Sequence, residues 1–354
     1  MNSAGEPARL VIDLAALRHN YRVLTSLAPG ARCAAVVKAD AYGIDAGAIA
    51  GTLQAAGCAD FFTATPDEGA QVRAVLGGAA NIYVLNGYQP GQHGHIALHQ
   101  LIPVIGSIDS LHAFRKEGGG RFALHVDTGM NRLGLSVGEA LSLPPGDDDG
   151  LCLIMSHLAC SDIPGHPLNA RQLERFRSVL SRYEGIPASL ANTGGILLGE
   201  DYHFDLVRPG VGLYGINPAT ERTDPFRTVL HVDAPVLQVR HVPAGETIGY
   251  GARYTAKEPR TIAIAGFGYA DGLPRAAWQH GFARIGDTPL PVAGMVSMDL
   301  TALDITGHEA LVRDAGRVQF YGSDIGPVAG AAGTIGYELL VRLGGRLKRE
   351  YTDR

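Results

Sequence analysis

The stretch "CAAVVKADAYG", residues 33–43, is a short apolar run that ends in a lysine, Lys38, and then in a turn. A strand covered on both faces is normally apolar throughout. The same pattern, an apolar run followed by a turn and a helix-like segment, recurs at 61–65, 82–87, 102–107, 122–129, 151–159, 188–195 and 204–210. Eight such units predict a (β/α)8 TIM barrel over residues 14–225, since a doubly wound open sheet usually has fewer strands.

Residues 226–354 have a different pattern. Short apolar runs separated by Gly, Pro and Asp turns predict a second, mostly β domain. The strand-like run at 9–13 would pair with this domain, which makes the barrel an insertion. Helical spacing is clear at 169–185, where Gly185 is a stop signal, and a second helical pattern covers 327–343.

Composition excludes several classes of function. The chain has 354 residues, 18% of them charged, and a net charge of −5 without a Lys/Arg cluster on any predicted face. This argues against nucleic acid and membrane surfaces as partners. The four cysteines form no CxxC pair and lie mostly in or beside apolar runs, which indicates reduced, buried thiols. With no signal peptide and no apolar segment of membrane-spanning length, the sequence predicts a cytoplasmic protein.

Polar side chains follow most of the predicted barrel strands, at Lys38, Asn86, Asp127, His157, Asn192–Thr193 and Arg208. Barrel enzymes carry their chemistry at the carboxyl ends of the strands. We therefore expect these side chains to face one mouth of the barrel.

Lys38 follows an apolar strand, and such a setting lowers the pKa of an amine. A neutral amine attacks carbonyl groups. The simpler alternative is that Lys38 caps the strand and pairs with Asp40.

The loops "ANTGG" (191–195) and "RPGVG" (208–212) follow the last two predicted strands. Barrels commonly hold a phosphate at this place through backbone N–H groups, and Thr193 adds a hydroxyl. An aldehyde-trapping lysine and a phosphate loop at one mouth predict pyridoxal 5'-phosphate (PLP) as cofactor, and no metal.

Nearly the whole chain resembles the alanine racemase family. The resemblance rests on seven motifs in the expected order: "AVVKADAYG" (35–43), "DTGMNRLG" (127–134), "SHLA" (156–159), "VRPGVGLYG" (207–215), "IGYGARYTA" (248–256), "GYADG" (268–272) and "VSMD" (296–299). It implies PLP-dependent racemisation of L- and D-alanine by a cytoplasmic homodimer with shared active sites.

The resemblance also implies roles for individual residues. Lys38 would bind PLP covalently and serve as the base on the D face, and Tyr250 of the other subunit would be the base on the L face. The other cofactor-binding residues implied are Tyr42, His157, Thr193, Arg208, Gly210 and Val211, and the substrate-binding ones are Arg132, Met298 and Asp299. In this scheme Arg208 faces the pyridine nitrogen, and a chain of donors through His157 and Arg208 lowers the pKa of Tyr250.

The sequence departs from the family pattern at His125, where some members have a carbamylated lysine that supports the substrate arginine. The anionic partner of Arg132 is then open, with Asp127 on the same side of the strand as a candidate. Two alternative functions stay open: a PLP-dependent racemase of another small amino acid such as serine, and a non-catalytic PLP-binding barrel. Tyr250 argues against the second. The sequence does not decide between a role in wall synthesis and one in alanine catabolism, nor the role of Asp40.

Overall fold

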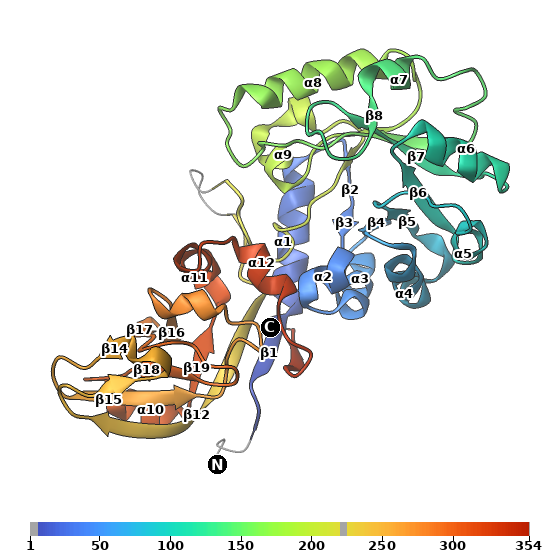
Figure 1. Ribbon diagram of the computed structural model, residues 1–354. Coiled ribbons are helices and arrows are strands. Elements are labelled where there is room, and N and C mark those ends of the chain that lie inside the picture. The colour runs from blue at the N-terminus through green and yellow to red at the C-terminus, as the bar shows by residue number, and fades with distance from the viewer. Residues whose placement is uncertain (1–5, 220–224, 354) are drawn as a thin grey trace. The chain divides into compact units, whose positions relative to one another are not determined.

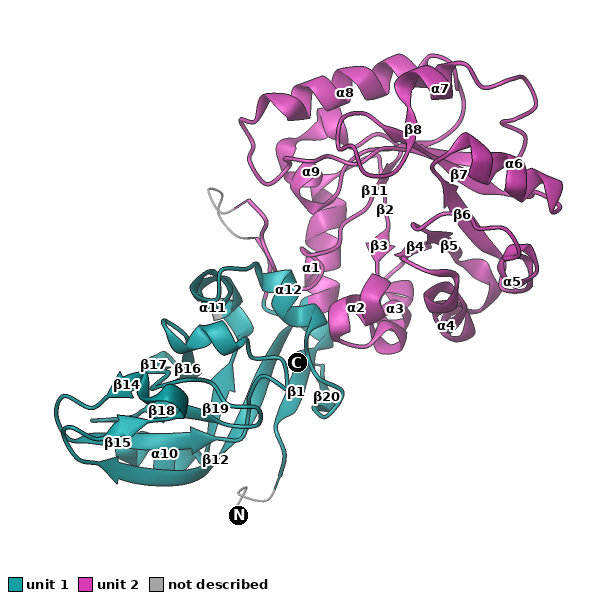
Figure 2. Cartoon of the chain, viewed as in Figure 1, with its two compact units in different colours: residues 1–16, 228–354 teal, residues 17–227 magenta. Residues whose placement is uncertain are grey.

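The computed structural model describes residues 6–219 and 225–353. The chain divides into two compact units, residues 17–227 and residues 1–16 with 228–354 (Figure 2). Within the described residues no helix has the length and apolar character needed to span a bilayer.

The unit of residues 17–227 is a parallel barrel, so the predicted fold class is confirmed. Its strands in the described residues are β2 (Arg32–Cys33) with β3 (Ala35–Val36), β4 (Asp60–Thr63), β5 (Asn81–Val84), β6 (Leu101–Ile105), β7 (Phe122–Asp127), β9 (Leu151–Met155), β10 (Ala188–Ser189) and β11 (Leu206–Val207). Neighbouring strands pair in parallel from β3 to β10, and β11 pairs with β2. Backbone bonds from Asp205 N to Ala188 O (3.1 Å) and from Arg208 N to Ala191 O (2.9 Å) join β10 to β11 and close the ring.

Helix α1 (Leu14–Leu27) precedes the first barrel strand, and helices lie between the strands that follow: α3 (Ala46–Ala55), α4 (Pro66–Leu76), α5 (His93–Leu98), α6 (Ile108–Lys116), α7 (Val137–Leu141), α8 (Pro167–Leu180) and α9 (Thr193–Leu198), with a short strand β8 (Leu135–Ser136) before α7. In Figure 1, α4, α5 and α6 lie on the outer side of strands β4 to β7. Inside the barrel, Phe62 and Tyr83 stack at 4.5 Å between ring centroids, among the small and branched side chains of the other strands. This packed interior supports the mouth where the polar groups lie.

Helix α8 ends at Leu180, and the prediction that it continues to Gly185 is wrong. Arg182 N and Tyr183 N bond to carbonyls three residues back, which tightens the chain into turns. The turns bury Tyr183, whose hydroxyl donates to Ala140 O at 2.5 Å. Burial of this ring favours the turns over continued helix.

The second unit is mostly β. Its main sheet has the order β17-β16-β19-β12-β1-β20, with β15 paired to β12 and β18 paired to β15. The bounds are β1 (Arg9–Asp13), β12 (Leu230–Val242), β13 (Thr247–Ile248), β14 (Tyr254–Thr255), β15 (Arg260–Ala265), β16 (Phe282–Ile285), β17 (Thr288–Pro291), β18 (Thr301–Asp304), β19 (Arg317–Phe320) and β20 (Lys348–Thr352). Strand β1 lies between β12, antiparallel, and β20, parallel.

Helices are few in this unit: α10 (Glu309–Ala315), α11 (Ile325–Ala331) and α12 (Gly336–Val341). The single helical pattern predicted over 327–343 is therefore two helices. Gly333, with φ +70°, turns the chain between them, and no helix passes through this left-handed conformation.

Candidate active site

Lys38 opens an unusual backbone segment, α2 (Lys38–Gly43), directly after β3. Four successive residues, Ala39 to Tyr42, have φ between +50° and +59°, so the segment is a left-handed turn. Residues with a Cβ disfavour this region by about 1–2 kcal/mol each. Tertiary contacts must hold it, and Asp40 supplies one: its Oδ1 accepts a bond from Ala46 N at 2.8 Å. This contact gives Asp40 the structural role that the sequence left open.

Lys38 is half-buried at the mouth of the barrel. Burial lowers its pKa below the ordinary value, the cation Arg132 lowers it further, and the carboxylate of Glu68 opposes them. Burial and a like charge disfavour the ammonium form, whereas the opposite charge of Glu68 favours it. A larger share of Lys38 is therefore neutral and nucleophilic at a given pH than for a lysine in water.

Arg208, after β11, is only 3% exposed. Its guanidinium donates to Ser189 Oγ, to Ser156 O at 2.6 Å and to Leu190 O at 3.4 Å, and lies 5.9 Å from the centroid of Phe62. Burial lowers the pKa of Arg208 to about 9, so the group stays cationic at neutral pH.

Two histidines share this mouth. Burial, then the cations Arg208 and Arg132, lower the pKa of His125 to about 4, and burial and the same cations hold the pKa of His157 well below its usual value. Both imidazoles are neutral at pH 7. No hydrogen bond joins the His157 ring to Arg208 among the described residues, so the donor chain towards Tyr250 stays a prediction. With both imidazoles neutral, the cations Arg208 and Arg132 beside them are suited to an anionic ligand.

Because of His125, the free energy of unfolding should decrease as the pH is lowered from 6.5 to 4. The unfolded chain protonates His125 near pH 6.5, but the folded chain does so only near pH 4, so the unfolded state binds more protons between these values. We expect the free energy of unfolding to drop by about 3 kcal/mol as the pH falls from 6.5 to 4 on account of this residue.

Urea unfolding of the PLP-free chain across this pH window measures the effect. His125→Gln should flatten the dependence, whereas His112→Gln, at a side chain that is 59% exposed, should not. Equal slopes for His125→Gln and the wild type would contradict the prediction.

A cradle of backbone N–H groups lies after β10 and β11. Thr193 Oγ1 accepts from Gly210 N at 3.1 Å and from Gly212 N at 3.3 Å. In the described residues Val211 N has no hydrogen-bond acceptor. A Cβ on Gly210 would collide with Tyr42 Oη, and one on Gly212 would lie 2.7 Å from Thr193 Cγ2, so the close approach requires glycine at both positions. The Val211 N–H and the Thr193 hydroxyl hydrogen are the donors that this loop offers to a phosphate.

Arg132 lies on a loop that the carboxylate of Asp127 organises. Asp127 accepts bonds from Gly129 N (2.8 Å), Met130 N (2.9 Å) and Arg132 N (3.2 Å). The carboxylate thus holds the loop backbone, and within the part of the chain that is described no carboxylate pairs with the Arg132 guanidinium. Asp127 therefore supports Arg132 by holding the backbone of its loop and not by pairing with its guanidinium. The sequence alone does not distinguish these two roles. The exposed guanidinium is available to a carboxylate ligand.

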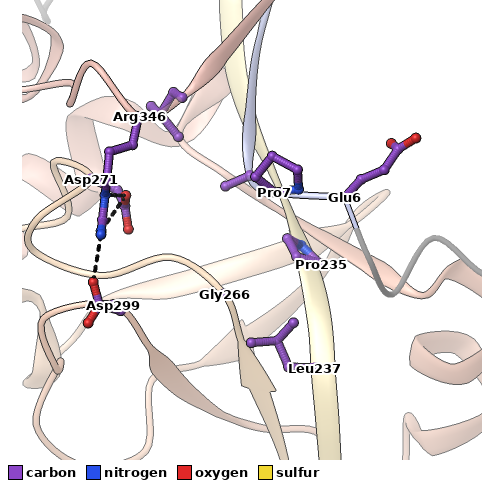
Figure 3. A pocket seen from close by; sticks show the side chains of 10 residues that line it. Glu6, Pro7, Pro235, Leu237, Gly266, Asp271, Asp299 and Arg346 are labelled. Carbon is purple, nitrogen blue, oxygen red and sulfur yellow. Dashed lines mark hydrogen bonds and ion pairs between the residues drawn. The ribbon is translucent and has the colours of Figure 1, made fainter.

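The other predicted site residues belong to the second unit. Tyr250, in the short 3₁₀ turn Tyr250–Ala252, is 70% exposed, and Met298 is 53% exposed. Met298 O accepts from Ala270 N at 2.9 Å, while Met298 N has no acceptor among the described residues. Arg346 pairs with both Asp299 and Asp271, at 2.8 Å each, at the edge of a pocket (Figure 3). This pairing fixes the loop that carries Met298.

Comparison with known proteins decides the family. The sequence profile "Alanine racemase, N-terminal domain" matches residues 12–218, and "Alanine racemase, C-terminal domain" matches residues 229–351. The chain belongs to the alanine racemase family. An alanine racemase of Methylobacterium nodulans is 46% identical over 98% of this chain and 96% of that protein, and one of Rhizobium meliloti is 43% identical over 97% and 96%.

A solved structure supports the same assignment. The crystal structure of alanine racemase from Bartonella henselae, with covalently bound pyridoxal phosphate, superposes with a TM-score of 0.91 at 35% identity, over 98% of this chain and 100% of that one. Alanine racemases are PLP-dependent isomerases built from a TIM barrel and a β domain.

Sequence reasoning missed several residues at the mouth of this alanine racemase fold. Ser156 and Ser189 end neighbouring strands and accept from Arg208, and the buried Tyr214 packs on Tyr42 at 4.8 Å and donates to Val36 O at 2.9 Å. Glu68 contacts the left-handed turn. The serines could have been found from their place at strand ends, as Lys38 was, but contacts across the barrel leave no signal in a single sequence.

Proposed function

We propose that this chain interconverts L-alanine and D-alanine, with PLP held at the mouth of the barrel unit, residues 17–227, and with Tyr250 supplied by the partner subunit of a homodimer. The observation that carries the proposal is the grouping of a lysine of lowered pKa, Lys38, with the Thr193 hydroxyl on its glycine loop and the cation Arg208 at one mouth. PLP has an aldehyde, which a neutral lysine can bind covalently, and a phosphate, which needs hydrogen-bond donors and positive charge nearby.

The residues present fit PLP. Lys38 would bind it covalently, Tyr42, Thr193, Gly210 and Val211 would surround the phosphate, and Arg208 would face the pyridine nitrogen. The glycines let Tyr42 and Thr193 pack directly against the loop backbone, and the cations Arg208 and Arg132 match an anionic phosphate and carboxylate. When bound, PLP draws electrons from the substrate Cα and makes its proton removable. His157, held neutral beside Arg208, would be a further neighbour of the cofactor.

Two bases on opposite faces are the simplest way to exchange a proton with inversion. Lys38 Nζ would take or return the proton on the D face, and Tyr250 Oη would do so on the L face. Arg132 and the backbone at Met298–Asp299 would orient the substrate carboxylate. The unpaired guanidinium of Arg132, the free Met298 N–H and the exposure of Tyr250 support these assignments within the described residues.

The test is to incubate the purified protein with L-alanine in deuterium oxide. We expect D-alanine labelled at Cα, and a yellow cofactor that borohydride fixes onto Lys38. Faster turnover of serine than of alanine would assign another racemase activity, and colour without exchange would assign a non-catalytic PLP-binding barrel.

Arg208 should control the side reaction. An arginine keeps its proton and offers only hydrogen bonds to the pyridine nitrogen, which weakens the electron sink. A carboxylate at this position would instead favour a proton on the pyridine nitrogen and so strengthen the electron sink. We therefore expect Arg208→Glu to raise transamination relative to racemisation by about tenfold, measured as pyruvate formed from alanine. Unchanged pyruvate formation per racemisation event would contradict this role.

A further inference from the structure

The left-handed turn after Lys38 needs an anchor at its start. A bond from Ala41 N to Val37 O at 2.9 Å lies near the centre of the turn, and Asp40 ties the turn to the following helix. Neither contact holds the first peptide of the turn, which joins Lys38 to Ala39. That peptide sets the direction in which the Lys38 side chain leaves the barrel strand.

Glu68, on α4, is bonded to this peptide. Its Oε1 accepts from Ala39 N at 3.0 Å, and its Oε2 accepts from Ala64 N, just after β4, at 2.7 Å. The sequence "TPDE" (65–68) has the form of a capping box, in which the glutamate would bond the backbone of Thr65. Thr65 Oγ1 does cap Glu68 N at 3.3 Å, but both carboxylate oxygens go elsewhere. One of them joins α4 to a segment distant in sequence.

Glu68 also acts on the charge of Lys38. The charges of Arg132 and Glu68 shift the pKa of the Lys38 amine, and the charge of Lys38 helps to lower the pKa of His157. Arg132 disfavours the ammonium form, His157 is neutral, and Glu68 favours the ammonium form. The carboxylate therefore limits how far the other effects lower the pKa of Lys38.

We propose that Glu68 is a positioning residue for Lys38: its carboxylate bridges the end of β4 and the first peptide of the left-handed turn, and so fixes the lysine for PLP attachment. The inference rests on the proposed function only in taking Lys38 as the PLP lysine. A glutamate is required because two N–H donors need two acceptor oxygens, whereas a glutamine offers one acceptor and one amino group.

The test compares three full-length variants with the wild type, all freed of PLP. Glu68→Gln removes the charge and one acceptor, and Glu68→Asp keeps the charge but is one methylene too short to bridge both donors. Glu117→Gln is the matched control, because Glu117 also accepts a backbone N–H, from Gly91, and the hydroxyl of Tyr88. The readouts are hydrogen–deuterium exchange of peptides covering 38–44, the dissociation constant of added PLP, and the pH midpoint of PLP attachment.

For Glu68→Gln we expect about tenfold faster exchange at 38–44, about tenfold weaker PLP binding, and an attachment midpoint lower by about 0.5–1 pH unit. Glu68→Asp should share the faster exchange but keep the wild-type midpoint, and it carries the test if Glu68→Gln does not fold. Glu117→Gln should match the wild type. Wild-type exchange and PLP affinity in both Glu68 variants, or the same changes in Glu117→Gln, would overturn the inference.

Failure of the proposed function has a different signature. If borohydride fixes no PLP onto Lys38 of the wild type, the proposed function fails, and the exchange at 38–44, which needs no PLP, still decides whether Glu68 holds the turn.

Discussion

Replacing Lys38 by alanine is expected to abolish racemisation, by at least about 10⁴-fold, and to leave the purified chain without the colour that borohydride fixes. Lys38 has two roles in the proposed function, as the covalent holder of PLP and as the base on the D face. Losing both removes more than losing either alone. Absorbance, borohydride trapping with peptide mapping, and the rate of D-alanine formation measure the three consequences.

Two further variants make the result specific. Lys38→Arg keeps the positive charge and most of the bulk, but its guanidinium stays protonated and does not attack carbonyl groups. It should be as inactive as Lys38→Ala. Lys116→Ala, at an exposed lysine on α6, should keep full activity and colour. A yellow, active Lys38→Ala variant would disprove the assignment, since the chain has only three other lysines to take its place.

The fold could be predicted because its signal is local. Each barrel strand shows as an apolar run and most strand ends carry a polar residue, so the rule that chemistry gathers at the carboxyl ends predicts Lys38, His157 and Arg208 as site residues. The helix limits were less predictable. The spacing over 169–185 fits a helix, but the burial of Tyr183 ends it at Leu180, and this depends on contacts outside the segment.

The site was less predictable than the fold because its supports come from distant segments. Nothing in "KADAYG" indicates a left-handed turn, since its L-residues disfavour that conformation, and the contacts of Glu68, Asp40 and Tyr214 that help to hold it come from outside the stretch or reach outside it. The capping-box pattern at 65–68 even suggests a purely local role for Glu68. A local pattern predicts a local structure, and it cannot show that an acceptor is used by another segment.

Tyr250→Phe is expected to lower racemisation by about 10²–10⁴-fold while leaving PLP attachment to Lys38 intact. The change removes only the hydroxyl, from a side chain that is 70% exposed, so we expect little effect on stability. Racemisation rates alone cannot show which face has lost its base. The two enantiomers are equal in free energy, and kcat/KM must therefore fall equally in both directions for any variant.

Isotope exchange without inversion separates the two faces. In deuterium oxide, Lys38 Nζ of the Tyr250→Phe variant should still remove the α-proton of D-alanine and return a deuteron to the same face, so D-alanine gains label while its configuration is kept. L-alanine, which needs a base on the opposite face, should exchange no faster than it racemises. Tyr351→Phe, at a second exposed tyrosine of the same unit, should behave as the wild type. Equal exchange of both enantiomers by Tyr250→Phe would mean that one base serves both faces, and the two-base assignment would be wrong.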